Sequence, residues 1–323
     1  MSSVNLVELW RGPFLESRHT GHMVVCGEDG SVEQAWGDPA RITLARSSIK
    51  ILQALPLMRS GAAANLSSEQ LALCCASHDG AAIHTERVAR WLADLGLGEA
   101  DLRCGPQEPD NRPARDGLIL AGEQPCQIHN NCSGKHAGFV TLNRHLGAGP
   151  EYVEVDHPLQ RMIREAFEDS VGEDSPGYGI DGCSAPNFAS SLAGIGRAMA
   201  KCAVAAADSA EGQLRDAMMA HPALVAGEGR ACTGLMRAMA GKGAVKTGAE
   251  GMFIAILPGL KKSVVLKIED GTTRAAEAAM AAVLVHLGVL EAGDPAVLAR
   301  VGGPILNRRG VDTGTTRMAP GVF

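Results

Sequence analysis

Strand-like segments lie at both ends of this chain, and a helical middle separates them. Residues 21–36 flank the turn Glu28-Asp29-Gly30, a hairpin signal, and residues 42–44 form a further short strand. Residues 252–268 repeat the hairpin pattern about a turn of their own. The apolar face of a sheet has to be buried, and the helices of the middle are available to bury it. The sequence therefore predicts an α+β fold, with one antiparallel sheet formed from both chain termini and helices on its faces.

The middle of the chain carries apolar residues at helical spacing. Ser67 and Ser68 predict a helix start, because serine caps the free N–H groups of a first turn. Residues 105–127, rich in Pro, Asp and Gly, predict a long loop and a candidate lid. The other helices are expected over residues 48–58, 85–95, 133–146, 158–171, 186–202, 232–239 and 273–290.

We expect a single domain spanning residues 1–323, with sheet-forming parts at about 1–46 and 243–323 and a helical part at about 47–242. The net charge of −6 gives no sign of a positively charged binding surface, so neither nucleic acid nor a membrane surface is an expected partner. No segment approaches the roughly 18 apolar residues that a membrane span needs. Residues 1–8 lack the basic and apolar regions of a secretory signal, so a cytoplasmic protein is expected.

The chain has nine cysteines, an odd number, and no Cys-x-x-Cys pair. In a reducing compartment a chain of this length does not need a disulfide framework. Most of these cysteines are therefore expected to be small buried hydrophobic residues.

Ser47 and Lys50 form the only Ser-x-x-Lys sequence of the chain, at a predicted strand-to-helix junction. Residues three apart on a helical turn share one face. A serine hydroxyl is a weak nucleophile until a base takes its proton, and a lysine whose pKa is lowered by burial and nearby positive charge is such a base. N–H groups at the start of the helix would stabilise an oxyanion. The alternative is a capping serine followed by a surface lysine.

The only Lys-Thr-Gly sequence, Lys246 to Gly248, directly precedes a predicted C-terminal strand. In penicillin-recognising hydrolases a Ser-x-x-Lys helix and a Lys-Thr-Gly strand face each other across the active site. The third element of those enzymes, Ser-x-Asn, is replaced here by Ser77-His78-Asp79-Gly80. Ser77 still provides a hydroxyl for proton transfer with Lys246, but the replacement disfavours β-lactam chemistry.

Two cysteine-bearing segments, residues 130–138 and 181–186, each open a predicted helix. If Cys132 and Cys183 meet in space, they can bind zinc together with a nitrogen ligand, for which His136 is the conventional choice. Two buried structural cysteines are the alternative, and spacing alone favours it.

Taken together, these segments resemble those of the rhizobial-type (class 3) L-asparaginases of the asparaginase II family. They occur in the family's order and span most of the chain. The matching segments are Ala45–Lys50, Cys75–Gly80, His129–His136, Asp181–Pro186 and Lys246–Gly251.

The resemblance implies a serine-β-lactamase-like fold, a homodimer, and hydrolysis of L-asparagine to L-aspartate and ammonia through a Ser-Lys acyl-enzyme mechanism. It implies that Ser47 is the nucleophile and Lys50 its base, and that Ser77 and Lys246 complete the proton relay. A neutral lysine base predicts activity that rises toward alkaline pH. The resemblance further implies substrate-binding roles for Arg46, His136, Asp181 and Gly248.

The resemblance also implies a zinc ion bound by Cys132, Cys183 and Lys135, the last in place of His136. This zinc ion would support substrate binding rather than activate water. The sequence leaves two other functions open. One is a glutaminase or another β-lactamase-like amidase or esterase, and the other is a non-catalytic, zinc-dependent amino-acid-binding protein. Lys50 and Lys246 disfavour the second, because a sensor needs no proton relay.

Overall fold

The computed structural model describes residues 2–323 and divides into two compact units. The first unit comprises residues 1–43, 191–204 and 234–323, and the second comprises residues 44–190 and 205–233. Helix 192–204, which the sequence placed in the helical part, belongs to the sheet-containing unit. That the two units act as a single domain stays a prediction. No helix of residues 2–323 combines the length and the apolar character that crossing a membrane requires.

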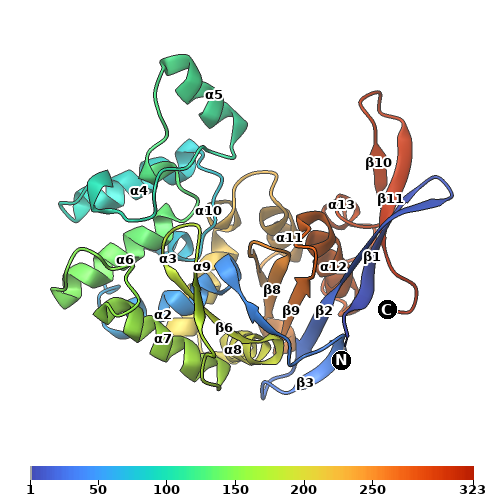
Figure 1. Ribbon diagram of the computed structural model, residues 1–323, viewed down its shortest axis with the longest axis horizontal. Coiled ribbons are helices and arrows are strands. Elements are labelled where there is room, and N and C mark those ends of the chain that lie inside the picture. The colour runs from blue at the N-terminus through green and yellow to red at the C-terminus, as the bar shows by residue number, and fades with distance from the viewer. Residues whose placement is uncertain (1) are drawn as a thin grey trace. The chain divides into compact units, whose positions relative to one another are not determined.

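The first unit contains an antiparallel sheet whose strands come from both ends of the chain, as predicted (Figure 1). Its strands are β1 (Val4–Arg11), β2 (Phe14–Cys26), β3 (Val32–Trp36), β7 (Ala244–Thr247), β8 (Met252–Leu257), β9 (Lys262–Ile268), β10 (Pro304–Leu306) and β11 (Asp312–Met318). Their order is β10-β11-β1-β2-β9-β8-β7, and β3 pairs with β2. The predicted α+β fold, with an antiparallel sheet built from both ends of the chain, is therefore confirmed.

The long strand β2 joins two parts of this sheet. Its first half pairs with β1, and its second half lies between β9 and β3. Gly21 stands where the partner changes, and a Cβ atom there would lie 2.4 Å from the carbonyl oxygen of Lys267. This close approach of two backbones requires glycine.

Helices cover both faces of the sheet. All six residues of β8 are buried, and successive side chains of a strand point to opposite faces. α8 packs on β2 and β9, and α12 packs on β1, β8, β9 and β11. The Ser263 hydroxyl donates to the Gly196 carbonyl at 2.7 Å and fixes α8 to the sheet. The helices of this unit are α8 (Leu192–Val204), α12 (Thr273–His286), α13 (Pro295–Leu298) and the 3₁₀ turn η4 (Pro258–Leu260). Helix α11 (Ala231–Met239) begins in the second unit and ends in the first.

The second unit is mainly helical. Its helices are α1 (Lys50–Gln53), α2 (Leu55–Arg59), α3 (Ser68–Cys74), α4 (Ala82–Asp94), α5 (Arg112–Ala121), α6 (Ser133–Leu146), α7 (Pro158–Val171), α9 (Ala210–Ala220) and α10 (Pro222–Val225). Three 3₁₀ turns join them: η1 (Arg46–Ile49), η2 (Glu99–Asp101) and η3 (Gln127–His129). The short strands β4 (Ile42–Leu44), β5 (Tyr178–Ile180) and β6 (Pro186–Ser191) form a sheet in the order β4-β6-β5.

Helix α6 is the centre of this unit. Its first ten residues, 133–142, are all buried, so the helix is enclosed on every side. It packs against α2, α3, α4 and α7. A Cβ atom at Gly134 would lie 2.6 Å from the Leu73 carbonyl oxygen, and one at Gly138 would lie 2.8 Å from the Cys74 sulfur. These two glycines bring α3 and α6 together and thereby fix the position of Cys132 and Lys135 at the start of α6.

Several helix predictions are confirmed by the structure, and two segments differ. Helices 133–146 and 158–171 have the predicted bounds, and Ser67 caps α3 through a capping box with Gln70. The predicted helix 186–202 begins instead as strand β6, because residues 186–191 pair with β5 and only the later residues are helical. The predicted loop 105–127 contains α5, which Asn111 caps through a hydrogen bond to the Ala114 N–H.

Candidate active site

A strained turn presents Ser47 between β4 and α1. The residue before it, Arg46, has a φ of +54°, a left-handed conformation that side-chain-bearing residues seldom adopt and that costs about 1–3 kcal/mol. Two interactions hold this conformation. The Arg46 N–H donates to Asn187 Oδ1 at 3.1 Å, and its guanidinium donates to Asp181 Oδ1 at 2.8 and 3.1 Å. The ion pair of Arg46 and Asp181, both predicted site residues, therefore holds the backbone that carries the predicted nucleophile.

The two neighbouring serines have different environments. The Ser48 side chain is buried, and its hydroxyl donates to the Ala45 carbonyl oxygen at 2.6 Å. Ser47 is partly exposed, and its hydroxyl makes no hydrogen bond to any of residues 2–323. Ser48 thus stabilises the turn, whereas Ser47 has a hydroxyl available to a substrate.

Lys50 is 1% exposed, and its ammonium group is enclosed by hydrogen-bond acceptors. Its Nζ donates to the Ser77 hydroxyl at 2.9 Å, to the Cys132 sulfur at 3.1 Å and to the Ala76 carbonyl oxygen. Three acceptors match the three N–H groups of a protonated lysine. The structure therefore brings Lys50 together with Ser77, another predicted catalytic residue, and no hydrogen bond of the described residues joins Lys50 to Ser47.

Ser77 follows the end of α3, and its backbone is fixed on both sides. The Ser77 N–H donates to the Val225 carbonyl oxygen at 2.9 Å, and the His78 N–H donates to the Asn131 carbonyl oxygen at 3.1 Å. The serine side chain is 9% exposed. These backbone bonds fix the distance between the Ser77 hydroxyl and Lys50.

The three predicted zinc ligands also lie together. Cys132 at the start of α6 and Cys183 in the loop before β6 interact with each other, and the Cys132 thiol donates to Asn131 Oδ1 at 2.9 Å. The Lys135 ammonium donates to the Cys183 sulfur at 3.1 Å and lies 5.1 Å from the centre of the Phe139 ring. Cys132, Cys183 and Lys135 are each at most 4% exposed. The sulfur of Cys132 is thus shared between this cluster and Lys50 of the predicted catalytic group.

Mutual interactions set the protonation of the cluster. The interaction with Cys132 lowers the pKa of Cys183 well below its usual value, and Lys135 adds to this against the effect of burial. The same interaction, together with burial, raises the pKa of Cys132 well above its usual value. Burial lowers the pKa of Lys135, but the two sulfurs outweigh burial and raise it overall. These shifts favour a thiolate at Cys183 and an ammonium at Lys135.

His136 lies beside this cluster with one unused ring nitrogen. Its Nδ1 lies 2.9 Å from the Tyr152 hydroxyl, whereas its buried Nε2 has no partner with hydrogen-bond geometry. Burial lowers the pKa of His136, which favours the neutral form of its ring. A buried nitrogen without a partner, beside two sulfurs, fits a site that accepts a soft cation or a polar ligand.

Lys246 and Gly248 lie in the first unit, on and directly after β7. Lys246 is 1% exposed, and its ammonium donates to the Thr247 carbonyl oxygen at 2.7 Å. The Gly248 N–H donates to the Met252 carbonyl oxygen at 2.8 Å, so the β7–β8 connection already uses this donor. The pairing of Lys246 with Ser77, and a substrate-binding role for Gly248, stay predictions.

The structure adds residues that the sequence did not identify as site residues. Asn187 contacts Arg46, which lies 141 residues away in the sequence. Tyr152 contacts His136, which lies 16 residues away. No local pattern marks them, because an asparagine on a short strand and a buried tyrosine are common in any fold. No disulfide joins the cysteines of residues 2–323. All of them but Cys126 are buried, and burial of most was expected.

A buried network fixes the segment after Ser77. The rings of His78 and His84 stack with centroids 4.7 Å apart, and His84 Nδ1 lies 3.2 Å from Asp79 Oδ1. Asp79 also accepts hydrogen bonds from the Asn111 amide at 3.1 Å and from the Ala81 N–H at 3.2 Å. Burial raises the pKa of Asp79, but these partners outweigh burial and lower it to about 2.

We expect Asp79→Asn to lower the free energy of unfolding by about 2 kcal/mol at neutral pH, since the pKa of this carboxyl falls from its usual 3.8 to about 2. A lowered pKa stabilises the fold above the unfolded-state value, and this contribution is lost as the pH falls through about 2. Urea unfolding at pH 7 and pH 2 measures the difference between variant and wild type, which should shrink at the lower pH. Asp94→Asn, an exposed change on α4, is the control. Equal stability of Asp79→Asn and wild type at pH 7 would contradict the role of this network.

Comparisons with known proteins agree with the resemblance. Among solved structures, the chain is similar to a β-lactamase from Mycobacterium bovis, with 17% identity, 82% of this chain and 94% of that chain covered, and a TM-score of 0.46. It is also similar to an octameric penicillin-binding protein homologue from Pyrococcus abyssi, with 13% identity, 94% and 84% covered, and a TM-score of 0.41. Scores at this level carry no argument about activity or assembly. No curated protein sequence matches the chain significantly. The family model of L-asparaginase II matches residues 7–318, nearly the whole length, and the chain therefore belongs to the L-asparaginase II family.

Proposed function

We propose that this protein hydrolyses L-asparagine to L-aspartate and ammonia, with Ser47 as the nucleophile. Membership of the L-asparaginase II family supports the general reaction. The observation that carries the mechanism is the buried amine of Lys50, held 2.9 Å from the Ser77 hydroxyl and three residues from the partly exposed Ser47 on a strained turn. Backbone strain and a buried amine are features that recur at nucleophilic active sites.

In the proposed first step, the Ser47 oxygen attacks the side-chain amide carbon of asparagine while Lys50 takes the Ser47 proton. Lys50 can do this in its neutral form, with the Ser77 hydroxyl as its side-chain hydrogen-bond partner, and this form becomes more populated toward alkaline pH. The tetrahedral intermediate collapses, the amide nitrogen takes a proton from Lys50, and ammonia leaves. Water then attacks the aspartyl ester, Lys50 accepts its proton, and the Ser47 hydroxyl is restored as aspartate leaves. Serine and lysine need to approach only when substrate is bound, because catalytic hydrogen bonds are often long in an empty site.

The Arg46–Asp181 ion pair is the proposed recognition element for the amino-acid part of the substrate. Its guanidinium and carboxylate are partly exposed, at 24% and 12% of the side-chain surface. A guanidinium suits the α-carboxylate, and a carboxylate suits the α-ammonium group. Because the same pair holds the backbone before Ser47, substrate binding and positioning of the nucleophile would be coupled.

We also propose that Cys132, Cys183 and Lys135 hold zinc. Two sulfur ligands suit this ion, and the family resemblance favours Lys135 over His136 as the nitrogen ligand. Lys135 and Cys132 would each lose a proton on binding. Bound zinc would supply a fixed positive charge that supports substrate binding. The residues themselves position Lys50, through the contact of its ammonium with the Cys132 sulfur.

We expect Cys183→Ala to lower zinc affinity at least about 100-fold. Mutation of residues that only hydrogen-bond to metal ligands already lowers metal affinity about 10- to 100-fold. Zinc content after dialysis, measured by mass spectrometry of the metal, provides the result. Cys74→Ala is the matched control, because Cys74 is an equally buried cysteine on α3 outside the cluster. Equal zinc retention by the two variants would remove Cys183 from the ligand set.

Turnover of L-asparagine, L-glutamine and a chromogenic β-lactam, measured side by side, tests the proposed substrate. Preferred turnover of asparagine supports the proposal. Preferred turnover of glutamine or of the β-lactam would assign the same Ser-Lys chemistry to another amide. Saturable binding of asparagine without ammonia release would indicate an amino-acid-binding protein instead.

A homodimer and a cytoplasmic location complete the proposal. Family resemblance supports the dimer, and the exposed apolar side chains of α5, Ile119 and Leu120 at 67% and 88%, provide surface that a second chain can cover. Light scattering of the purified protein measures its mass. A monomer at micromolar concentration would exclude the dimer.

A further inference from the structure

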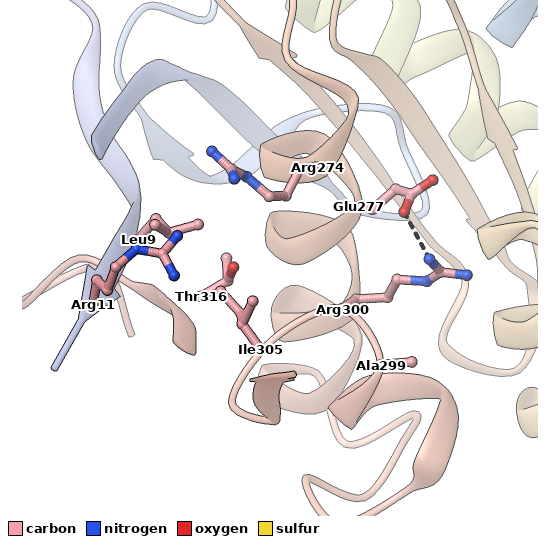
Figure 2. Close-up of a pocket in the computed structure, with 8 residues that line it drawn as sticks. All are labelled: Leu9, Arg11, Arg274, Glu277, Ala299, Arg300, Ile305 and Thr316. Carbon is pink, nitrogen blue, oxygen red and sulfur yellow. Dashed lines mark ion pairs between the residues drawn. The ribbon is translucent and has the colours of Figure 1, made fainter. Parts of the chain in front are cut away.

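A pocket in the first unit, far along the sequence from the proposed catalytic residues, is lined by three arginines (Figure 2). Its volume is about 400 Å³, within the range of small-molecule sites. The lining comes from β1, α12, β11 and the segment from α13 to β10. Figure 2 shows Arg11 and Arg274 on one side of the pocket and the Glu277–Arg300 ion pair on the other.

Two of the three guanidinium groups have a carboxylate partner. Arg300 lies 3.1 Å from Glu277, and Arg11 lies 2.9 Å from Glu16. Arg274 has no carboxylate within ion-pair distance anywhere in residues 2–323. The pocket therefore contains one guanidinium whose charge no direct ion pair neutralises, beside a second that is half exposed.

A buried histidine, His19, holds the guanidinium of the exposed Arg274 in place. One of its N–H groups donates to His19 Nε2 at 3.2 Å, and His19 Nδ1 lies 2.6 Å from Asp270. An arginine only donates, so Nε2 of His19 must accept, and the ring proton on Nδ1 donates to Asp270. His19 is 5% exposed and fixed at both nitrogens. The guanidinium of Arg274 is thus oriented in advance, which lowers the entropy that a ligand has to overcome on binding.

The rest of the lining is apolar or neutral. Leu9 and Ile305 provide apolar surface, and the Thr316 hydroxyl makes no hydrogen bond as donor or acceptor within the described chain. Figure 2 shows Thr316 and Ile305 between the arginine side and the ion pair. An oxyanion with an apolar body matches this arrangement, because charged and apolar groups would each meet a suitable surface.

We propose that this pocket binds a small organic carboxylate. The carboxylate accepts hydrogen bonds from Arg274 and Thr316, and its carbon body lies against Leu9 and Ile305. The proposal does not depend on the reaction at Ser47, and it predicts a second ligand site on the protein.

Calorimetric titration of the full chain with sodium benzoate and with inorganic phosphate tests the proposal. Benzoate is expected to bind saturably, one per chain, and more tightly than phosphate, which lacks an apolar body. Arg274→Gln should weaken benzoate binding about tenfold, because charge-assisted hydrogen bonds of this kind are lost. Arg308→Gln, an exposed change of equal charge outside the pocket, should leave the affinity unchanged.

Three results would overturn the proposal: no saturable binding of benzoate, an equal effect of the two arginine variants, or tighter binding of phosphate than of benzoate. Titration of Arg46→Gln separates this site from the proposed active site, where Arg46 would bind a carboxylate, since benzoate binding should survive that substitution.

Discussion

Lys50→Met is expected to lower kcat/KM for L-asparagine by at least about 1,000-fold, because it removes the proposed base while keeping an unbranched side chain. Wild-type Lys50 is 1% exposed and donates to three acceptors, among them Ser77 and Cys132. Methionine offers none of these hydrogen bonds. We therefore also expect a loss of about 1–3 kcal/mol of stability from acceptors left without donors.

Activity and stability have to be separated for this variant. Thermal unfolding followed by circular dichroism shows which fraction is folded, and kcat/KM is then expressed per folded molecule. Lys242→Met, at an exposed position in a turn, controls for the loss of one lysine. Wild-type turnover by folded Lys50→Met would mean that another group takes the Ser47 proton.

Ser47→Ala is expected to lower turnover by about 10,000-fold or more, as for other serine nucleophiles. The substitution removes one exposed hydroxyl that makes no hydrogen bond to the described chain, so the fold should keep its stability. Ser48→Ala is the matched control at the next position. It removes the hydrogen bond to the Ala45 carbonyl oxygen, which should cost about 1 kcal/mol of stability but leave the nucleophile in place.

Acid quenching of the wild-type enzyme during turnover, followed by mass spectrometry of its peptides, checks the same assignment chemically. An aspartyl ester is expected on Ser47 and absent from Ser48 and Ser77. An ester on Ser77, which lies beside the same lysine, would exchange the roles of the two serines.

Local patterns predicted those parts of the structure that local interactions determine. The capping box at Ser67, the helix from Pro158 to Val171 and the hairpin of β8 and β9 follow from caps, periodicity and turn residues. Residues 186–191 were predicted as helix because their apolar residues fit either period. Pairing with β5 decides in favour of a strand, and no local pattern reveals that partner.

In the candidate site too, local patterns predicted some features, whereas others depend on contacts between distant parts of the chain. The Ser-x-x-Lys spacing predicted that Ser47 and Lys50 belong together, and the resemblance grouped Cys132, Lys135 and Cys183. Neither the spacing nor the resemblance indicated that Lys50 contacts Cys132, because the two lie 82 positions apart and meet only through the tertiary packing of the second unit. This contact joins the proposed catalytic pair to the proposed zinc site. Loss of metal should therefore affect kcat as well as substrate affinity.

Ammonia release from L-asparagine by the purified wild type, beside Ser47→Ala and Ser48→Ala, tests whether this protein is an asparaginase with Ser47 as its nucleophile. We expect release by the wild type and by Ser48→Ala, and none above background by Ser47→Ala. Release by Ser47→Ala at the wild-type rate would refute the nucleophile, and no release by the zinc-loaded wild type would refute the proposed reaction.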